Sequence, residues 1–168
     1  MQNKLTKRKF DNVEQVYGYA MSLLNYRDYS SKDMFQKLTA KGAQPAEANE
    51  AIAKLLEHNF INEERYANQV FRAWLNKKEC GKRSLYMELH HKNVSEECIP
   101  MVMESFTDEM EEANAQKAIR YFIKHKCGKN KYTRESLLAT GARFMTNRGF
   151  SSRYIQVLLD ILRNDDDI

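Results

Sequence analysis

The sequence predicts an all-helical protein built from three tandem three-helix repeats. Only two prolines and six glycines occur among its 168 residues, and strands and tight turns need more of both. Leucine, alanine, lysine, glutamate, methionine and arginine, which are all good helix formers, are abundant. Apolar residues recur at the helical period of three to four residues, and one pattern of helix starts and stops returns along the chain.

The first repeat is expected over residues 12–60 and contains three helices. Apolar residues at helical spacing predict a first helix that ends near Tyr26. Ser30 has an acidic residue three positions later, a capping-box pattern that begins the second helix. Gly42 fits the left-handed position just past the end of that helix. Pro45 then fits the first turn of the third helix.

The second repeat is expected over residues 61–107. Asn62 can cap its first helix, and the helical spacing places Trp74 on the buried side. The short second helix is predicted to stop at Asn93, because asparagine tolerates the left-handed conformation better than most residues other than glycine. Ser95 is predicted to cap the third helix.

The third repeat is expected over residues 108–163. Its first helix has an acidic first turn and a basic last turn, an order that suits the helix dipole at both ends. The second helix is predicted to start near Thr133 and to stop at Gly149, and Ser151 is predicted to cap the last one. A basic and an acidic tail flank the repeats: residues 1–11 and 164–168.

A pair consisting of a basic residue and a small residue closes the second helix of every predicted repeat. The small residues of successive pairs are 51 and 56 positions apart, and an apolar residue precedes each of them by four. Any helical bundle yields some such coincidences, but cap, stop and spacing recur together here, which favours a true repeat. The pairs are Lys41–Gly42, Lys92–Asn93 and Arg148–Gly149.

Composition excludes several classes of protein. The mean hydropathy is −0.71, and no stretch approaches the roughly 18 apolar residues that would span a bilayer. The first ten residues lack the apolar segment of a signal peptide. The three cysteines are odd in number and far apart, so they predict no disulfide framework but reduced thiols in a cytoplasmic protein.

No catalytic, cofactor-binding or metal-binding motif is apparent. The chain lacks the glycine-rich phosphate-binding patterns and the HExxH zinc pattern. Cys80 with the His90–His91 pair lacks the tight spacing of a zinc site. Trp74 and the other aromatic residues fall at helical spacing, which favours core packing over base stacking. We therefore expect a binding protein that is not an enzyme and has no cofactor.

Positive charge is concentrated in the last third of the chain. Residues 113–153 carry ten lysines and arginines and a single acidic residue, Glu135. This density indicates a polyanion or an acidic protein groove as the partner, although basic residues are usually exposed to solvent in any case. The predicted cluster is Lys124, Lys126, Lys129, Lys131 and Arg134, extended by Arg143, Arg148 and Arg153 if their helices face the same way.

Three segments, in order along the chain, resemble the RecX family of bacterial regulatory proteins. Residues 27–42 resemble the family pattern R-x-Y/H-S-x-x-E-L-x-x-K-L-x-x-K-G, and residues 60–67 resemble L-x-D-D-x-R-Y/F-A. Residues 81–94 resemble G-x-x-x-I-x-x-E-L-x-x-K-G-I, with Asn93 in place of a usual glycine. The arginine expected before Gly81 is also missing.

The resemblance implies an elongated, curved array of repeats that binds along the groove of the RecA–DNA filament. It implies a monomer that inhibits or modulates recombinase and co-protease activity in DNA repair. Such a protein contacts single- or double-stranded DNA directly or through the filament, and it needs no membrane. The missing arginine leaves three basic residues as electrostatic substitutes, although lysine lacks the planar fork of arginine. They are Lys77, Lys82 and Arg83.

Two other functions stay open at this point. The basic third repeat also suits a stand-alone DNA-binding protein, because three-helix units resemble helix-turn-helix modules. The chain could instead be a helical scaffold for another protein. The sequence does not decide whether the protein inhibits, disassembles or caps a filament.

Overall fold

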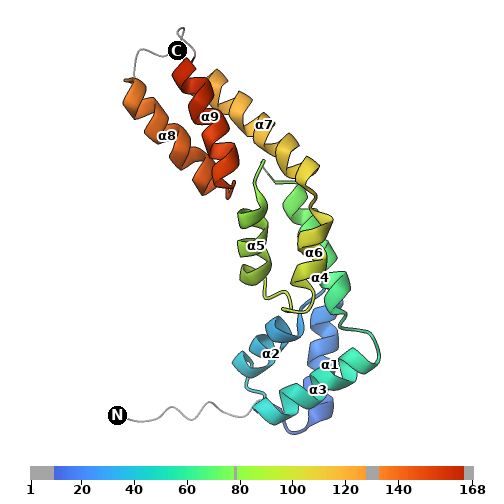
Figure 1. Ribbon diagram of the computed structural model, residues 1–168. Helices are drawn as coiled ribbons and strands as arrows, with labels where there is room; N and C mark the ends of the chain where they lie inside the picture. Colours follow the sequence, from blue (N-terminus) through green and yellow to red (C-terminus); the bar gives the residue numbers. More distant parts are fainter. Residues whose placement is uncertain (1–9, 78, 128–132, 165–168) are drawn as a thin grey trace, which may run out of the picture. The chain divides into compact units, whose positions relative to one another are not determined.

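The computed structural model confirms the all-helical prediction. The residues that it describes form nine helices and no strand (Figure 1). None of these helices is both long and apolar enough to cross a membrane. The described residues are 10–77, 79–127 and 133–164. The chain divides into two compact units, Met1–Gln69 with Asn93–Cys98 and Val70–Lys92 with Ile99–Ile168.

The first unit is built around three mutually packed helices, α1, α2 and α3, and also contains the start of α4 (Figure 1). Ser30 begins α2 as predicted, because its side chain accepts a hydrogen bond of 3.1 Å from the Asp33 backbone. Asn62 caps α4 in the same way, accepting from the Arg65 backbone at 2.7 Å. The helices are α1 (Val13–Leu24), α2 (Ser31–Ala40), α3 (Pro45–Glu57) and α4 (Glu63–Leu75).

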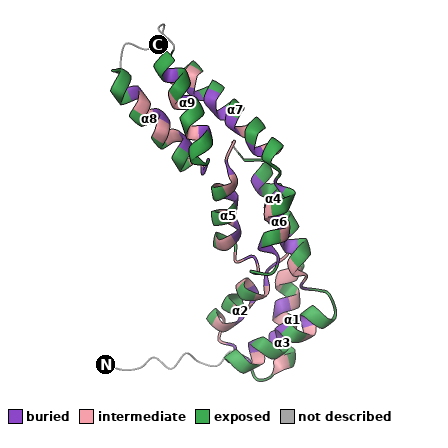
Figure 2. Cartoon of the chain, in the orientation of Figure 1, coloured by how far each residue is buried: buried purple, intermediate pink, exposed green. Residues whose placement is uncertain are grey.

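The second unit contains the end of α4 and five further helices. Within it α7, α8 and α9 pack against one another, and α5 packs against α6. Each helix buries one stripe and exposes the rest, as expected of amphipathic helices (Figure 2). The helices are α5 (Lys82–His91), α6 (Ile99–Ser105), α7 (Asp108–Lys126), α8 (Arg134–Asn147) and α9 (Ser152–Asn164).

The predicted stops are confirmed, and one predicted start is wrong. Gly42, Asn93 and Gly149 have φ values of 104°, 53° and 74°, the left-handed conformation that ends a helix. Ser95 does not cap α6, because its carbonyl accepts from the Cys98 backbone in a turn. The helix begins one turn later, where Pro100 occupies its first turn without costing a hydrogen bond.

The residue that stops one helix contacts the first turn of an earlier helix at two equivalent places. The Asn93 side chain donates a hydrogen bond of 2.6 Å to the Asp33 carboxylate, at the third residue of α2. Gly149 lies against Ser84, the third residue of α5, so closely that a Cβ atom on Gly149 would be 2.3 Å from the Ser84 nitrogen. Asparagine is therefore useful at the first contact, whereas only glycine fits the second.

A glutamate from the second helix further along the chain also caps α2 and α5. The Glu63 carboxylate accepts from the Ser31 backbone at 2.7 Å, and the Glu111 carboxylate accepts from the Lys82 backbone at 2.8 Å. Each donor is the first residue of its helix. The two compact units do not coincide with the three predicted repeats, so the repeat boundaries themselves stay a prediction.

Candidate functional site

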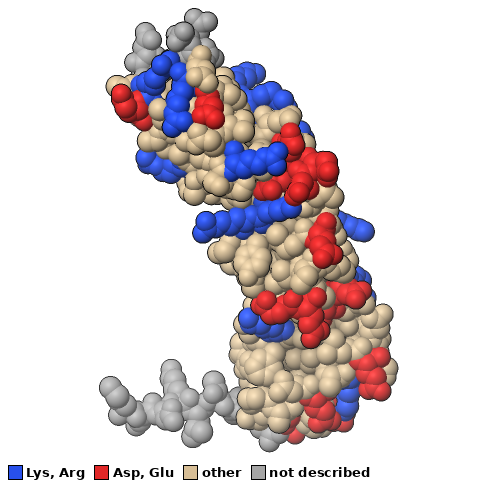
Figure 3. All heavy atoms as spheres, viewed as in Figure 1, with Lys and Arg blue, Asp and Glu red and all other residues tan. Residues whose placement is uncertain are grey.

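The predicted basic residues fall into two groups in the second unit. The first, the junction group, surrounds the start of α5 and the turn between α8 and α9. The second, the α7-end group, lies where α7 ends and α8 begins, in the region where Figure 3 shows many Lys and Arg side chains. The junction group is Lys82, Arg83, Arg148 and Arg153; the α7-end group is Lys124, Lys126 and Arg134. Lys129 and Lys131 lie outside the described residues.

The sequence analysis joined Arg143, Arg148 and Arg153 to the predicted cluster only if their helices face the same way. Arg148 follows Arg134 by fourteen residues, about 21 Å along α8 at the usual rise per residue. Arg148 and Arg153 therefore lie at the opposite end of α8 from Arg134. Arg143 lies between the two groups and is exposed.

Backbone contacts hold the junction group together. The Gly81 nitrogen donates to the Arg148 carbonyl at 2.9 Å, and the Arg83 nitrogen donates to the Gly149 carbonyl at 3.2 Å. A Cβ atom on Gly81 would lie 2.5 Å from the Gly149 oxygen. The first turn of α5 is thus tied directly to the turn between α8 and α9, which brings residues some 65 positions apart together.

Glu111 occupies the anion-binding position at the start of α5. This side chain is only 6% exposed, and its carboxylate accepts a hydrogen bond from the Lys82 backbone. The amino end of a helix attracts negative charge, because its first backbone N–H groups have no partner within the helix. Since the protein fills this position with its own carboxylate, the start of α5 is not available to a phosphate.

Replacing Glu111 by alanine is expected to lower the free energy of unfolding by about 1–3 kcal/mol, because a buried backbone donor loses its acceptor. Glu111→Gln keeps an acceptor oxygen and should lose only the charge, about 0.3–1 kcal/mol. Urea unfolding followed by circular dichroism measures both. Equal losses in the two variants would show that the hydrogen bond is not the important part of this contact.

Two of the predicted binding cations are engaged within the protein. Lys82 forms an ion pair with Asp108; the hydrogen bond between them lowers the pKa of Asp108 and raises the pKa of Lys82. Lys77 forms an ion pair of 2.7 Å with Glu88. A partner polyanion would have to compete with these carboxylates, so neither lysine is a strong candidate for the main contact.

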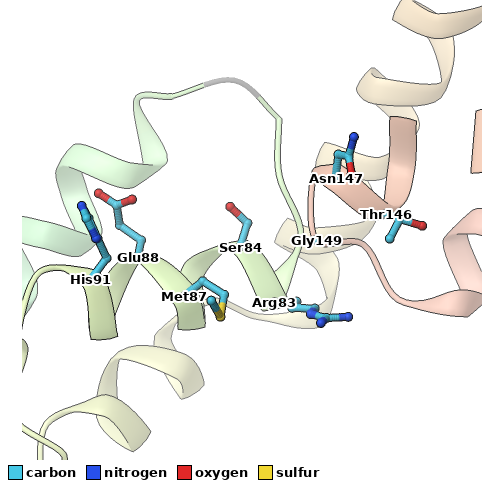
Figure 4. A pocket seen from close by; sticks show the side chains of 8 residues that line it. All are labelled: Arg83, Ser84, Met87, Glu88, His91, Thr146, Asn147 and Gly149. Carbon is cyan, nitrogen blue, oxygen red and sulfur yellow. The ribbon is translucent and has the colours of Figure 1, made fainter. Parts of the chain in front are cut away.

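Arg83 is an accessible cation of the junction group. It is exposed, and its side chain forms no ion pair among the described residues. Figure 4 shows it at the side of a groove of about 490 Å³ between α5 and the end of α8. Met87 and His91 of α5 and Asn147 of α8 also line this groove. The groove therefore offers one free positive charge beside apolar and hydrogen-bonding groups.

A series of stacked side chains runs along the seam between α7 and α8. The Tyr121 and His125 rings stack with centroids 4.2 Å apart, and the Tyr121 and Phe144 rings are nearly parallel at 6.2 Å. The Arg148 guanidinium lies 3.8 Å from the centre of the Phe144 ring. We call these four residues the stacking seam. It connects the junction group to the α7-end group.

Sequence reasoning missed the stacking seam. The prediction that aromatic residues are core residues is correct for Trp74, which is 3% exposed, but wrong for Tyr121, which is 49% exposed. Tyr121 lies four residues after Lys117 and three residues before Lys124, the first residue of the predicted cluster. Both lysines therefore share its helix face. An aromatic residue between cations on one face was the available signal.

The part of the chain that the structure describes holds no group of three or more histidine, cysteine, aspartate or glutamate residues placed to bind a metal ion. Cys80, Cys98 and Cys127 are not joined by disulfide bonds. The candidate site offers charged groups, hydrogen-bonding groups and stacked rings.

The sequence and the fold of this chain are both similar to those of proteins named RecX. A model of the first three-helix domain of RecX matches residues 17–55. The regulatory protein RecX of Vibrio campbellii is 32% identical over 150 residues, which cover 88% of this chain and 90% of that protein. The regulatory protein RecX of Bacillus cytotoxicus is 28% identical over 161 residues, 94% of this chain but only 57% of the relative. The chain thus spans little more than half of that longer relative.

Two solved structures are similar in fold. The crystal structure of RecX from Lactobacillus salivarius aligns with a TM-score of 0.75 at 18% identity, covering 91% of this chain and 97% of that one. A second crystal structure, of a regulatory protein RecX, aligns with a TM-score of 0.77 at 20% identity, covering 89% of this chain and 74% of that one.

Proposed function

The chain belongs to the RecX family of regulatory proteins, and from this we propose that it binds the RecA–DNA filament and inhibits or modulates recombinase and co-protease activity in DNA repair. The alignment with the Vibrio campbellii protein, which covers nearly the whole of both chains, carries the proposal. The RecA filament and its DNA are the proposed partners. The protein acts by binding and not by catalysis, as a monomer in the cytoplasm.

The charge distribution of the second unit supports contact with the filament. The eleven proposed contact residues are those of the junction and α7-end groups together with Lys77, Lys129, Lys131 and Arg143. Each cation that approaches a phosphate releases bound counterions, so such a surface gains affinity for DNA without reading its sequence. Arg83, Arg143 and Lys124 should contribute, because they are among the contact residues that are exposed and form no ion pair among the described residues.

Hydrolysis of ATP by the cognate RecA on single-stranded DNA tests the proposal. Filament formation is required for this activity, so a protein that occupies the filament should lower the rate as its concentration rises. Co-sedimentation with preformed filaments shows in parallel whether the protein binds them. An unchanged rate and no co-sedimentation at a stoichiometric ratio to RecA would overturn the proposal.

Charge reversal at the accessible cations should weaken this inhibition. We expect the variant with Arg83, Arg143 and Lys124 all replaced by glutamate to need at least about tenfold more protein for half-inhibition. A tenfold effect corresponds to about 1.4 kcal/mol, a modest loss for three exposed cations near phosphates. The same ATPase titration measures it.

Lys32→Glu is a control for the effect of a single charge reversal outside the proposed surface. Lys32 is exposed in the first turn of α2 in the first unit, where an acidic residue suits the helix dipole. This variant should inhibit like the unmodified protein. If it loses as much inhibition as the triple variant, net charge and not the proposed surface governs binding.

A stand-alone DNA-binding function remains the second candidate, favoured by the ten cations of residues 113–153. Gel shifts without RecA, across a series of salt concentrations, separate the two functions. Tight binding to DNA alone that weakens steeply with salt, together with no effect on RecA, would favour the second.

A further inference from the structure

The stacking seam suggests a more specific role for the α7–α8 surface. We propose that the Tyr121–His125 pair is a stacking platform for an unpaired base of single-stranded DNA, with Lys117 and Lys124 contacting the adjacent phosphates. This inference deepens the proposed function and rests on it for the biological role, but DNA binding by the isolated protein tests it separately.

The pair is held in place before any ligand arrives. Its members are four residues apart on α7, where side chains meet on one helix face. The His125 Nδ1 atom lies 2.8 Å from the Tyr121 carbonyl oxygen, so this nitrogen donates and the imidazole ring is fixed. Phe144 supports the tyrosine from α8. A base that stacks here therefore meets rings that lose little freedom on binding.

The pair is also accessible. Tyr121 is 49% exposed, and His125 is exposed as well. Phe122, the next residue along α7, is fully buried and supplies the core contact of this turn. The fold therefore does not need the Tyr121 ring as a core residue, and its exposed area is available to a ligand.

The charge around the pair favours a nucleic acid over an apolar partner. Lys117 lies four residues before Tyr121 and Lys124 three after it, so their Cβ atoms are about 5–6 Å from its own. Arg120 adds a third exposed cation. From residue 113 to its end α7 carries no aspartate or glutamate. Aromatic rings between cations are the combination that binds single strands, through base stacking and phosphate contact together.

An unpaired base is required by the geometry of stacking. Within a duplex both faces of every base are covered by its neighbours, so a side-chain ring reaches only the terminal base or a flipped one. In a single strand the faces are free, and stacking tolerates any base because each one has a π face. The seam therefore predicts preference for single strands without preference for sequence.

Fluorescence anisotropy with two labelled 15-unit oligomers tests the inference. One is oligothymidylate and the other is an abasic deoxyribose-phosphate strand with the same number of phosphates. The unmodified protein should bind oligothymidylate more tightly. Tyr121→Ala should weaken that binding by about 5- to 100-fold, as expected for the loss of one stacked base, and should leave binding to the abasic strand unchanged. Tyr121→Phe should bind like the unmodified protein.

Tyr86→Ala is the matched control. Tyr86 is 45% exposed and also has a histidine four residues later, but the Tyr86 and His90 rings meet edge to face at 65°. This variant should bind oligothymidylate normally. Lys124→Ala should weaken binding to both oligomers and reduce the slope of log affinity against log salt by about 0.7.

Three results would overturn the inference: equal affinity of the unmodified protein for the two oligomers, no loss with Tyr121→Ala, or an equal loss for both oligomers. The ATPase assay separates this failure from failure of the proposed function. If the unmodified protein inhibits RecA and the Tyr121→Ala variant binds oligothymidylate normally, the stacking inference is wrong and the proposed regulatory function stands. If binding to oligothymidylate depends on Tyr121 but the protein has no effect on RecA, the stacking inference stands and the proposed regulatory function is wrong.

Discussion

Replacing Gly149 by alanine is expected to lower the free energy of unfolding by about 2–5 kcal/mol. About 1–2 kcal/mol comes from the left-handed backbone, φ 74°, which disfavours a Cβ atom. A further 1–3 kcal/mol comes from overpacking, since that Cβ atom would lie 2.3 Å from the backbone nitrogen of Ser84. A backbone atom in the first turn of α5 cannot move aside as a flexible side chain could.

Gly18→Ala provides the control for this prediction. Gly18 lies within α1, and nothing is within 4 Å of the position that its Cβ atom would take. Alanine there should raise the free energy of unfolding by about 0.5–1 kcal/mol, because it loses less backbone entropy in a helix. Urea unfolding followed by circular dichroism at 222 nm measures both variants. A Gly149→Ala protein as stable as the unmodified chain would mean that α5 and the α8–α9 turn are not in close contact.

Truncation of Trp74 to alanine is expected to cost about 3–5 kcal/mol, the usual range for a large buried aromatic side chain. The Trp74 ring meets the Phe106 ring edge to face with centroids 5.1 Å apart, and its Nε1 atom donates to the Ser84 hydroxyl at 3.3 Å. The substitution leaves a cavity at the end of α4 and removes the partner of that hydroxyl. Because Trp74 is the only tryptophan, circular dichroism and not tryptophan fluorescence must follow the unfolding.

Leu75→Ala is the control for the Trp74 substitution. Leu75 is the next residue of the same helix but is 38% exposed, so its truncation should cost less than about 1 kcal/mol. Equal stabilities of the two variants would show that the Trp74 ring is not a core group.

The motif residues that resemble the RecX family hold the fold together rather than presenting a binding surface. Arg65 forms an ion pair of 2.9 Å with Asp28, which links α4 to the segment before α2. Ser30 caps α2, and Gly81 packs against Gly149. These motif residues therefore identify the architecture. The proposed contacts with DNA are other residues, namely Lys82 and Arg83 within the segment 81–94 and the cations and rings outside the three segments.

The sequence by itself determined where most helices begin and end. Ser30, Asn62 and Thr133 each accept a hydrogen bond from a backbone N–H three residues along, and Gly42, Asn93 and Gly149 take the left-handed conformation. These features are local, because a cap or a stop depends on the geometry of only four or five consecutive residues. Such signals can therefore be read from the chain without knowledge of its neighbours in space.

Only the tertiary structure decided which side chains are exposed and which charges are paired. Helical spacing favoured core packing for the aromatic residues, yet the packing of α7 against α8 left Tyr121 49% exposed. It also buried Glu111 as the cap of a helix that begins 29 residues earlier. Exposure, pairing of charges and approach of backbones depend on contacts between distant segments, and hydrophobic periodicity constrains which face is buried but not what covers it.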